Sequence, residues 1–191
     1  MPCRGSDIII YAYLAAQKLK ADYAIAASVG QGLTVGSAPI SGSYAKNGDY
    51  SFGADVVIVH VGNEDVAVTG DGAVTAEALA SAYQAFLKNV RAVHGSNAKI
   101  VCVSTSSNEV LKTALETACT ELGGETAGYY AKLLTASAGK LPTAAEHTAY
   151  ADTLATYIDS IKNNTVISPE LQGAASGYGV EVDFGSSDWE A

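Results

Sequence analysis

Three histidines are the side chains of this sequence that could act as bases near neutral pH. His60 ends an apolar run, which is typical of a hydrogen-bonded core histidine. His94 precedes Gly95 at the end of a helical pattern, where a cation interacts favourably with the helix dipole. His147 lies in the first turn of the last predicted helix, so it is the candidate general base.

Three serines in predicted loops, Ser6, Ser28 and Ser187, are candidate nucleophiles by their position. A serine hydroxyl attacks an acyl group efficiently only when a neighbouring base takes up its proton. Because loop serines most often form turns and helix caps, a structural role is preferred for each of them until its base is identified. If a histidine served one of these serines as its base, the chemistry would be acyl transfer.

An acidic loop is the candidate cation site of the sequence. It contains Glu64, Asp65 and Asp71, with Gly70 and Gly72 beside the last of these. Carboxylate oxygens suit a hard cation such as calcium, but the loop lacks the regular ligand spacing of known calcium loops. We therefore predict a solvated acidic turn, and no metal or other cofactor.

Composition excludes several classes of function. Of 191 residues, 48% are apolar and 16% charged, which excludes general intrinsic disorder. Eleven Lys and Arg against 20 Asp and Glu give a net charge of −9, so nucleic acids are not expected partners. The apolar stretch at residues 8–16 is far shorter than the roughly 20 residues of a membrane span.

The number of cysteines argues against a disulfide-stabilised fold. Three are too few for a disulfide scaffold, and Cys102 and Cys119 lie in apolar patterns that predict small buried side chains. The cellular compartment stays open, with an extracellular location preferred.

The elements that must position these residues alternate between strands and helices. This alternation predicts an α/β domain with three α/β/α layers and a doubly wound, mainly parallel sheet, as in flavodoxin-like folds. We expect this domain to cover residues 1–162, followed by a carboxyl-terminal tail at 163–191. The predicted strands are 22–29, 54–61, 98–104 and 126–134, and the predicted helices are 8–20, 75–94, 106–123 and 143–162. The helix 75–94 has an apolar stripe at three- and four-residue spacing. Capping boxes are predicted for the last two helices, Ser106 with Glu109 and Thr143 with Glu146.

Several blocks, in this order, resemble the SGNH/GDSL hydrolases, in particular the branch that contains two-domain carbohydrate esterases. The blocks are YLAAQKLKADY at 13–23, GQGL at 30–33, ADVVIVHVGNED at 54–65 and LPTAAEH at 141–147, and the similarity covers about residues 11–161. The resemblance implies a serine esterase. Its nucleophile lies in a Gly-Asp-Ser turn, a Gly N–H and an Asn amide hold the oxyanion, and an Asp and a His complete the relay.

Part of that machinery carries over. Gly32 and Gly62 stand at oxyanion-like positions, and Asp65 matches the acid of the third block. Glu64, however, stands where the family has its asparagine. A carboxylate offers no N–H and would repel a developing oxyanion.

The positions of the family's catalytic Asp and His differ more strongly from the family pattern. Gly139 and Leu141 occupy the places of the family's aspartate and histidine, and leucine cannot accept a proton. His147 lies one turn after that slot, so it could act only if the helix were shifted. These substitutions predict a degenerate site with no more than residual catalysis.

The first block of the family, a strand that runs into the nucleophile turn, is not found before residue 11. The segment VEVDFGSS at 180–187 resembles it, with Ser187 at the nucleophile position and Ser186 in place of the aspartate. We hypothesise that the tail supplies this strand, either within its own chain or to a neighbour. The alternation of Glu181 and Asp183 favours addition to the edge of a neighbour. The assembling side chains would be Val180, Val182 and Phe184.

Three functions follow from these observations. The preferred one is a non-enzymatic structural or self-assembling module that forms a homo-oligomer or filament through its tail. The alternative is a serine esterase or deacetylase acting on acylated carbohydrate, with a rearranged relay of Ser187 or Ser6 and His147. A third is a protein that binds a carbohydrate or another small ligand without hydrolysing it.

Overall fold

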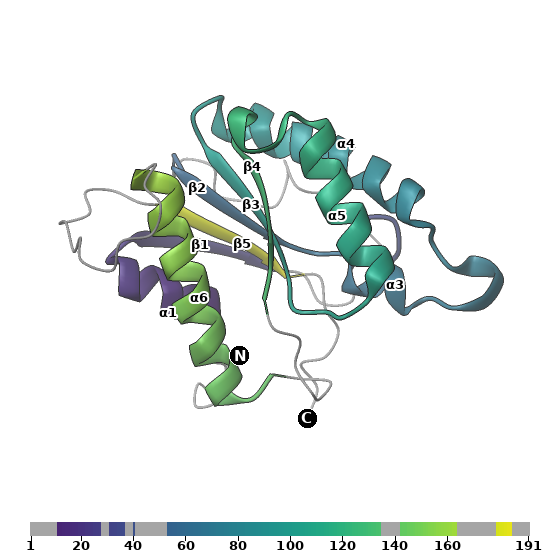
Figure 1. Ribbon diagram of the computed structural model, residues 1–191, viewed down its shortest axis with the longest axis horizontal. Helices are drawn as coiled ribbons and strands as arrows, with labels where there is room; N and C mark the ends of the chain where they lie inside the picture. Colours follow the sequence, from purple (N-terminus) through teal and green to yellow (C-terminus); the bar gives the residue numbers. More distant parts are fainter. Residues whose placement is uncertain are drawn as a thin grey trace, which may run out of the picture.

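The computed structural model describes residues 11–27, 31–36, 40, 53–134, 142–163 and 179–184. Figure 1 shows the helices and strands in these ranges. In chain order they are α1 (Tyr11–Leu19), β1 (Asp22–Ala27), β2 (Val56–His60), α3 (Asn63–Ala67), the 3₁₀ turn η1 (Gly70–Gly72), α4 (Ala76–His94), β3 (Lys99–Ser104), α5 (Glu109–Glu121), the 3₁₀ turn η2 (Gly124–Ala127), β4 (Tyr129–Leu133), α6 (Ala144–Asn163) and β5 (Gly179–Phe184).

The five strands form one parallel sheet in the order β1-β5-β2-β3-β4. The continuous apolar run of β2 is buried from Val56 to Val59, as a strand covered on both faces requires. The predicted α/β class and parallel sheet are therefore confirmed.

Alternate residues of the central strands face two different cores. Val57 and Val59 of β2 belong to the core that includes the apolar stripes of α4 and α5. Val56 and Ile58 belong to the core that includes α1 and α6. Since successive side chains of a strand point to opposite faces, the helices cover the sheet on both sides, as Figure 1 shows.

Local capping explains where two of the helices begin. Before α6, the Thr143 N–H donates to Glu146 Oε2 (2.7 Å) and the Glu146 N–H to Thr143 Oγ1 (3.3 Å), which confirms the predicted capping box. At α5 the expected box of Ser106 and Glu109 is not formed. Asn108 caps this helix instead, and its Oδ1 accepts from the N–H groups of Val110 and Leu111.

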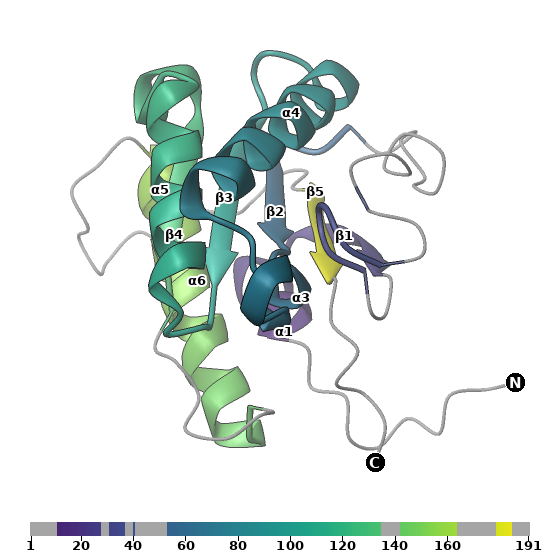
Figure 2. The same ribbon diagram turned by 90° about the vertical axis from the view of Figure 1, so that its right-hand side faces the viewer.

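The position of β5 differs from the edge position that its charge alternation favoured. β5 lies between β1 and β2 of its own chain (Figure 2), with Val182 in register with Ile25 on one side and Ile58 on the other. β1 and β2 are consecutive along the chain before β5 but are not neighbours in the sheet. A strand at this place forms backbone hydrogen bonds with a neighbour on each side. This pairing decides the position of β5, although the alternation of Glu181 and Asp183 favours an edge.

Within the described ranges, no helix has both the length and the apolar character that crossing a bilayer would require.

Candidate functional site

The carboxyl ends of the parallel strands meet at one edge of the sheet, where α/β folds bind their ligands. Among the described residues, the edge is formed by the last residues of the five strands and by those described residues that follow them. The last residues are Ala27, His60, Ser104, Leu133 and Phe184.

Asp65 holds together two of the segments at this edge. Its side chain is completely buried, and its carboxylate accepts hydrogen bonds from the N–H groups of Leu33 (2.8 Å) and Thr34 (2.7 Å). It also accepts the hydroxyl of Thr34. The residues after β1 are thereby tied to α3, so the expectation of a solvated carboxylate is wrong for Asp65.

Gly32 is required beside this carboxylate. A Cβ atom on Gly32 would lie 2.4 Å from Asp65 Oδ2, which is far inside van der Waals contact. The Gly32 N–H donates to the carbonyl of Val35 (3.0 Å), and its own carbonyl accepts from Ile40 (3.0 Å). This N–H thus has a partner within its own segment. The oxyanion-like role expected for Gly32 stays a prediction.

Gly62 makes the sharp turn at the end of β2. Its φ of 102° lies in the left-handed region, and a Cβ there would come within 2.6 Å of Leu111 and 2.7 Å of the Tyr83 hydroxyl. The Tyr83 hydroxyl donates to the carbonyl of Val61, which fixes the strand end against α4. Only glycine fits this position, whatever chemistry follows it.

Asn63 and Glu64 come directly after this turn, in the first turn of α3. Both side chains are half-buried. The Asn63 Oδ1 atom is buried and has no hydrogen-bond partner among the described residues. Sequence reasoning overlooked Asn63, because the family pattern places its amide one position later, where Glu64 stands.

The candidate base His147 packs into an aromatic cluster instead of facing solvent. Its side chain is 8% exposed, and its ring stacks on Tyr11 with centroids 6.2 Å apart and an interplanar angle of 18°. Tyr150 meets both rings edge-on. Burial lowers the pKa of His147, and the nearby Glu146 carboxylate opposes that shift in part.

His60 belongs to the same cluster. Its Nδ1 atom lies 2.9 Å from the Tyr11 hydroxyl, and burial lowers its pKa to about 4. Burial, together with the nearby Tyr150, raises the pKa of Tyr11. At neutral pH the cluster therefore contains neutral groups, which agrees with the predicted core role of His60. His94 lies in the last turn of α4, where the dipole argument placed it.

The acidic loop does not gather into a cation site. Asp71 is exposed in η1, whereas the carboxylate of Asp65 is occupied by three donors. Across the part of the chain that the structure describes, no group of three or more His, Cys, Asp or Glu side chains could hold a metal. Glu64, Asp65 and Asp71 thus share a segment of chain but not a binding geometry.

Several predicted site residues lie outside the described residues. They are Ser6, Ser28, Gly139, Leu141 and Ser187. Of the tail residues expected to mediate assembly, Val180, Val182 and Phe184 lie in β5, and their backbone is paired on both sides within the chain.

Comparison with known proteins finds solved structures with a similar fold. No model of a known protein family matches the chain, and no curated protein is significantly similar in sequence. The fold resembles that of a carbohydrate esterase family 2 enzyme plus carbohydrate-binding domain from Corynascus thermopiles (Myceliophthora fergusii), with a TM-score of 0.71 and 21% identity over 81% of this chain. It also resembles an acetyl xylan esterase from the rumen bacterium Butyrivibrio proteoclasticus, with a TM-score of 0.65 and 20% identity over 81% of this chain.

The chain spans 57% and 56% of these two proteins. At such identities the likeness concerns the fold. At that level it agrees with the resemblance drawn from the sequence blocks: the chain has the α/β/α fold of these two esterases.

Proposed function

We propose that this protein is a catalytically degenerate carbohydrate-esterase-like module that acts by association and not by hydrolysis. The observation that carries the proposal is the half-buried Glu64 in the first turn of α3, directly after the left-handed turn at Gly62. It stands in the slot where the hydrolases that the sequence resembles place a neutral amide donor.

Electrostatics gives the physical reason. Acyl transfer needs hydrogen-bond donors aimed at the oxygen that becomes negative in the transition state, and removing one such donor costs roughly a hundred- to a thousandfold in rate. A carboxylate removes the donor and adds a like charge. The second expected donor, the Gly32 N–H, is engaged by the carbonyl of Val35.

The histidines support the same conclusion. His60 and His147 pack against the ring of Tyr11, and burial lowers the pKa of both. An imidazole that must become charged during proton transfer is disfavoured in such an environment.

Hydrolysis of p-nitrophenyl acetate and of acetylated xylan tests the proposal. We expect no turnover above that of buffer, and no difference between the intact chain and Ser187→Ala, Ser6→Ala or His147→Ala. Robust turnover that one of these substitutions abolishes would overturn the proposal. The double substitution Glu64→Asn with Leu141→His is a matched gain-of-function variant, because it restores two of the family's residue types.

A specific observation favours one second candidate, a serine esterase for acylated carbohydrate with a rearranged relay. β5 lies between β1 and β2, so the chain leaves the carboxyl edge at Phe184, three residues before Ser187. The Asn63 amide lies in α3 and His147 in the first turns of α6, and both helices follow strands of this edge. Loss of activity in both Asn63→Ala and His147→Ala would identify this enzyme.

Two kinds of surface could mediate the association: β5 itself, or the free edge of another strand. The backbone of β5 is paired on both sides, so assembly through Val180, Val182 and Phe184 would require β5 to leave its own sheet. A free edge elsewhere is a less costly surface.

A further inference from the structure

β1 has a neighbouring strand on one side among the described strands, and it has exposed apolar side chains. β1 is the last strand on its side of the described sheet. The described residues include three exposed large apolar side chains, and two of them, Tyr23 (46% exposed) and Ile25 (38%), lie on β1. An edge strand also presents backbone N–H and C=O groups that a further strand can pair with.

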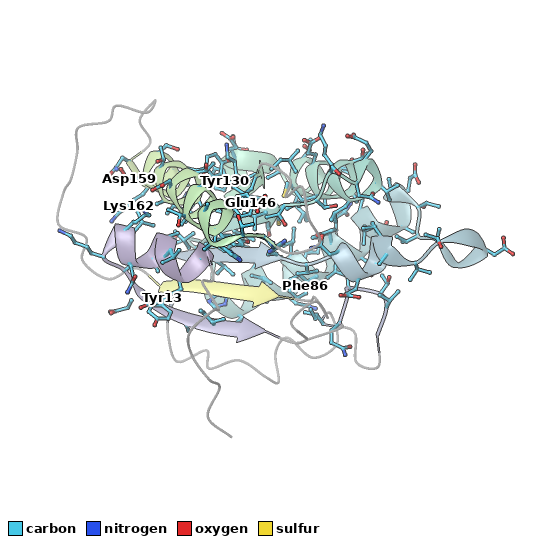
Figure 3. The ribbon with its side chains drawn as sticks, turned by 90° about the horizontal axis from the view of Figure 1, so that it is seen from below. Tyr13, Phe86, Tyr130, Glu146, Asp159 and Lys162 are labelled. Atoms are coloured by element: carbon cyan, nitrogen blue, oxygen red, sulfur yellow. The ribbon has the colours of Figure 1, made fainter. Side chains whose placement is uncertain are left out.

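The two exposed side chains lie on one face of the strand, because residues two apart in a β-strand point to the same side. The Tyr23 ring packs edge-on against Tyr13 of α1, with centroids 5.1 Å apart. Figure 3 shows Tyr13 beside β1, with β5 as the next strand of the sheet. Tyr23 is therefore held in place before any partner arrives, which reduces the entropy lost on binding.

Within the described residues, the opposite edge strand has a charged side chain in its second half, whereas β1 has none beyond its first position. β4 has Lys132 in its second half, with the ammonium 4.9 Å from the centre of the Tyr157 ring. Charged side chains on an edge strand, lysine above all, discourage pairing with other chains. In β1 the one charged residue is Asp22, at the first position of the strand.

We propose that β1 pairs with β1 of a second copy of this chain, antiparallel, about a twofold axis through Ala24. This inference rests on the proposed function, in which the module acts by association. In this register Tyr23 lies opposite the partner's Ile25, and the reverse pair forms on the other side of the axis. Aromatic and β-branched residues are a favourable cross-strand pair.

The same register avoids a clash of charges and limits the assembly to two chains. Asp22 lies opposite the partner's Ala26, so the two acidic side chains do not face each other. The contact uses the same surface on both copies and therefore closes as a dimer, in contrast to the filament that strand donation by the tail would produce.

Mass measurement by light scattering tests the surface. We expect a particle of twice the chain mass of 19.5 kDa for the wild type, and of 19.5 kDa for Ile25→Lys. Val68→Lys is the matched control, because Val68 is equally exposed at 38% but lies after α3, and it should remain a dimer. A monomeric wild type, or a dimer that survives Ile25→Lys, would overturn the proposal.

Cross-linking tests the register. A residue on the axis faces its own copy at about 4.5 or 5.5 Å between Cα atoms, and a disulfide accepts about 4.4 to 6.8 Å. Mild oxidation should therefore link position 24 to position 24 in Ala24→Cys. In the control Asp22→Cys the two positions are four residues apart along the pair, about 13 Å, and no link should form. Equal cross-linking of both variants would contradict the register.

The two proposals can fail separately. Esterase activity in the dimeric wild type would overturn the proposed function and leave the pairing intact. A monomeric wild type without esterase activity would overturn the proposed pairing of β1, but it would agree with the proposed absence of hydrolysis.

Discussion

At the residue scale, Asp65 shows that a residue of the family motif can hold two distant segments of the fold together. The sequence placed it in an acidic turn, next to Glu64 and near Asp71. Its actual partners, Leu33 and Thr34, lie more than thirty residues earlier, so no local pattern could reveal them. A buried carboxylate with three donors needs no ligand to explain its place in the fold.

The substitution Asp65→Asn should destabilise the protein without a cation being involved. The amide side chain would accept fewer hydrogen bonds than the carboxylate and would bring an N–H group against two backbone donors. Hydrogen bonds to charged groups contribute about 1.5–3 kcal/mol, so we expect a loss of at least about 2 kcal/mol. Urea unfolding measures it. The exposed Asp71→Asn is the control, and an equal effect of both substitutions would contradict the assigned role.

The buried His60 predicts a dependence of stability on pH. Its pKa is lowered from 6.5 to about 4 in the folded protein, so between these values the unfolded chain takes up a proton that the folded chain does not. The free energy of unfolding should therefore fall as the pH drops from 6.5 towards 4, and level off below. At about 1.4 kcal/mol per pKa unit, the loss is on the order of 3 kcal/mol.

Urea unfolding at several pH values, for the wild type, His60→Gln and the double variant His60→Gln/His147→Gln, checks this expectation. His60→Gln should remove most of the fall between pH 6.5 and 4, and the double variant should reduce it further, because burial also lowers the pKa of His147. A fall of the same size in the wild type and in His60→Gln would contradict the role of His60.

At the element scale, Arg91 joins α4 to two segments, the one that precedes β3 and the one that precedes β4. Its Nη1 atom donates to the carbonyls of Gly95, Ser96 and Ala98, and its Nη2 atom to those of Ala127 and Gly128. The guanidinium carbon also lies 4.5 Å from the centre of the Tyr129 ring. Sequence reasoning found the helix but not this role, because the carbonyls gather only in the folded chain.

Arg91→Lys should test this junction. Lysine keeps the charge but cannot present a planar fork of donors to five carbonyls, so we expect a loss of about 1.5–3 kcal/mol in the free energy of unfolding. The reverse exchange at the exposed Lys88, Lys88→Arg, should change stability by less than about 0.5 kcal/mol. Similar effects at both positions would show that charge alone matters.

At the scale of the whole molecule, what depends on local pattern was predictable and what depends on distant contacts was not. The apolar run of β2, the stripe of α4 and the capping box of α6 follow from spacing, and the structure confirms them. The cap of α5 shifted by two residues because Asn108 competes with Ser106 for the same role. The central place of β5 could not be read from its charges, because it is decided by the slot between two other strands.

Deleting residues 179–191 should abolish the cooperative fold. The deletion removes every pairing between β5 and its neighbours, and it leaves the facing edges of β1 and β2 open. We expect circular dichroism to show a broad thermal transition and hydrogen exchange to be fast in β1. Deleting only residues 185–191 keeps all described elements and should preserve the transition. A cooperative transition in the longer deletion would show that β5 is dispensable.

The position of β5, central in the sheet but late in the sequence, also has a consequence for folding during synthesis on the ribosome. Asp22 pairs with Gly179, so the ribosome must add more than 150 residues between these two partners. Until then β1 and β2 cannot be joined, and the nascent chain keeps two unpaired edges in what will become the middle of its sheet. Contacts between such distant residues also slow folding. Until β5 has been synthesised, the unpaired edges of β1 and β2 can therefore pair with strands of other chains.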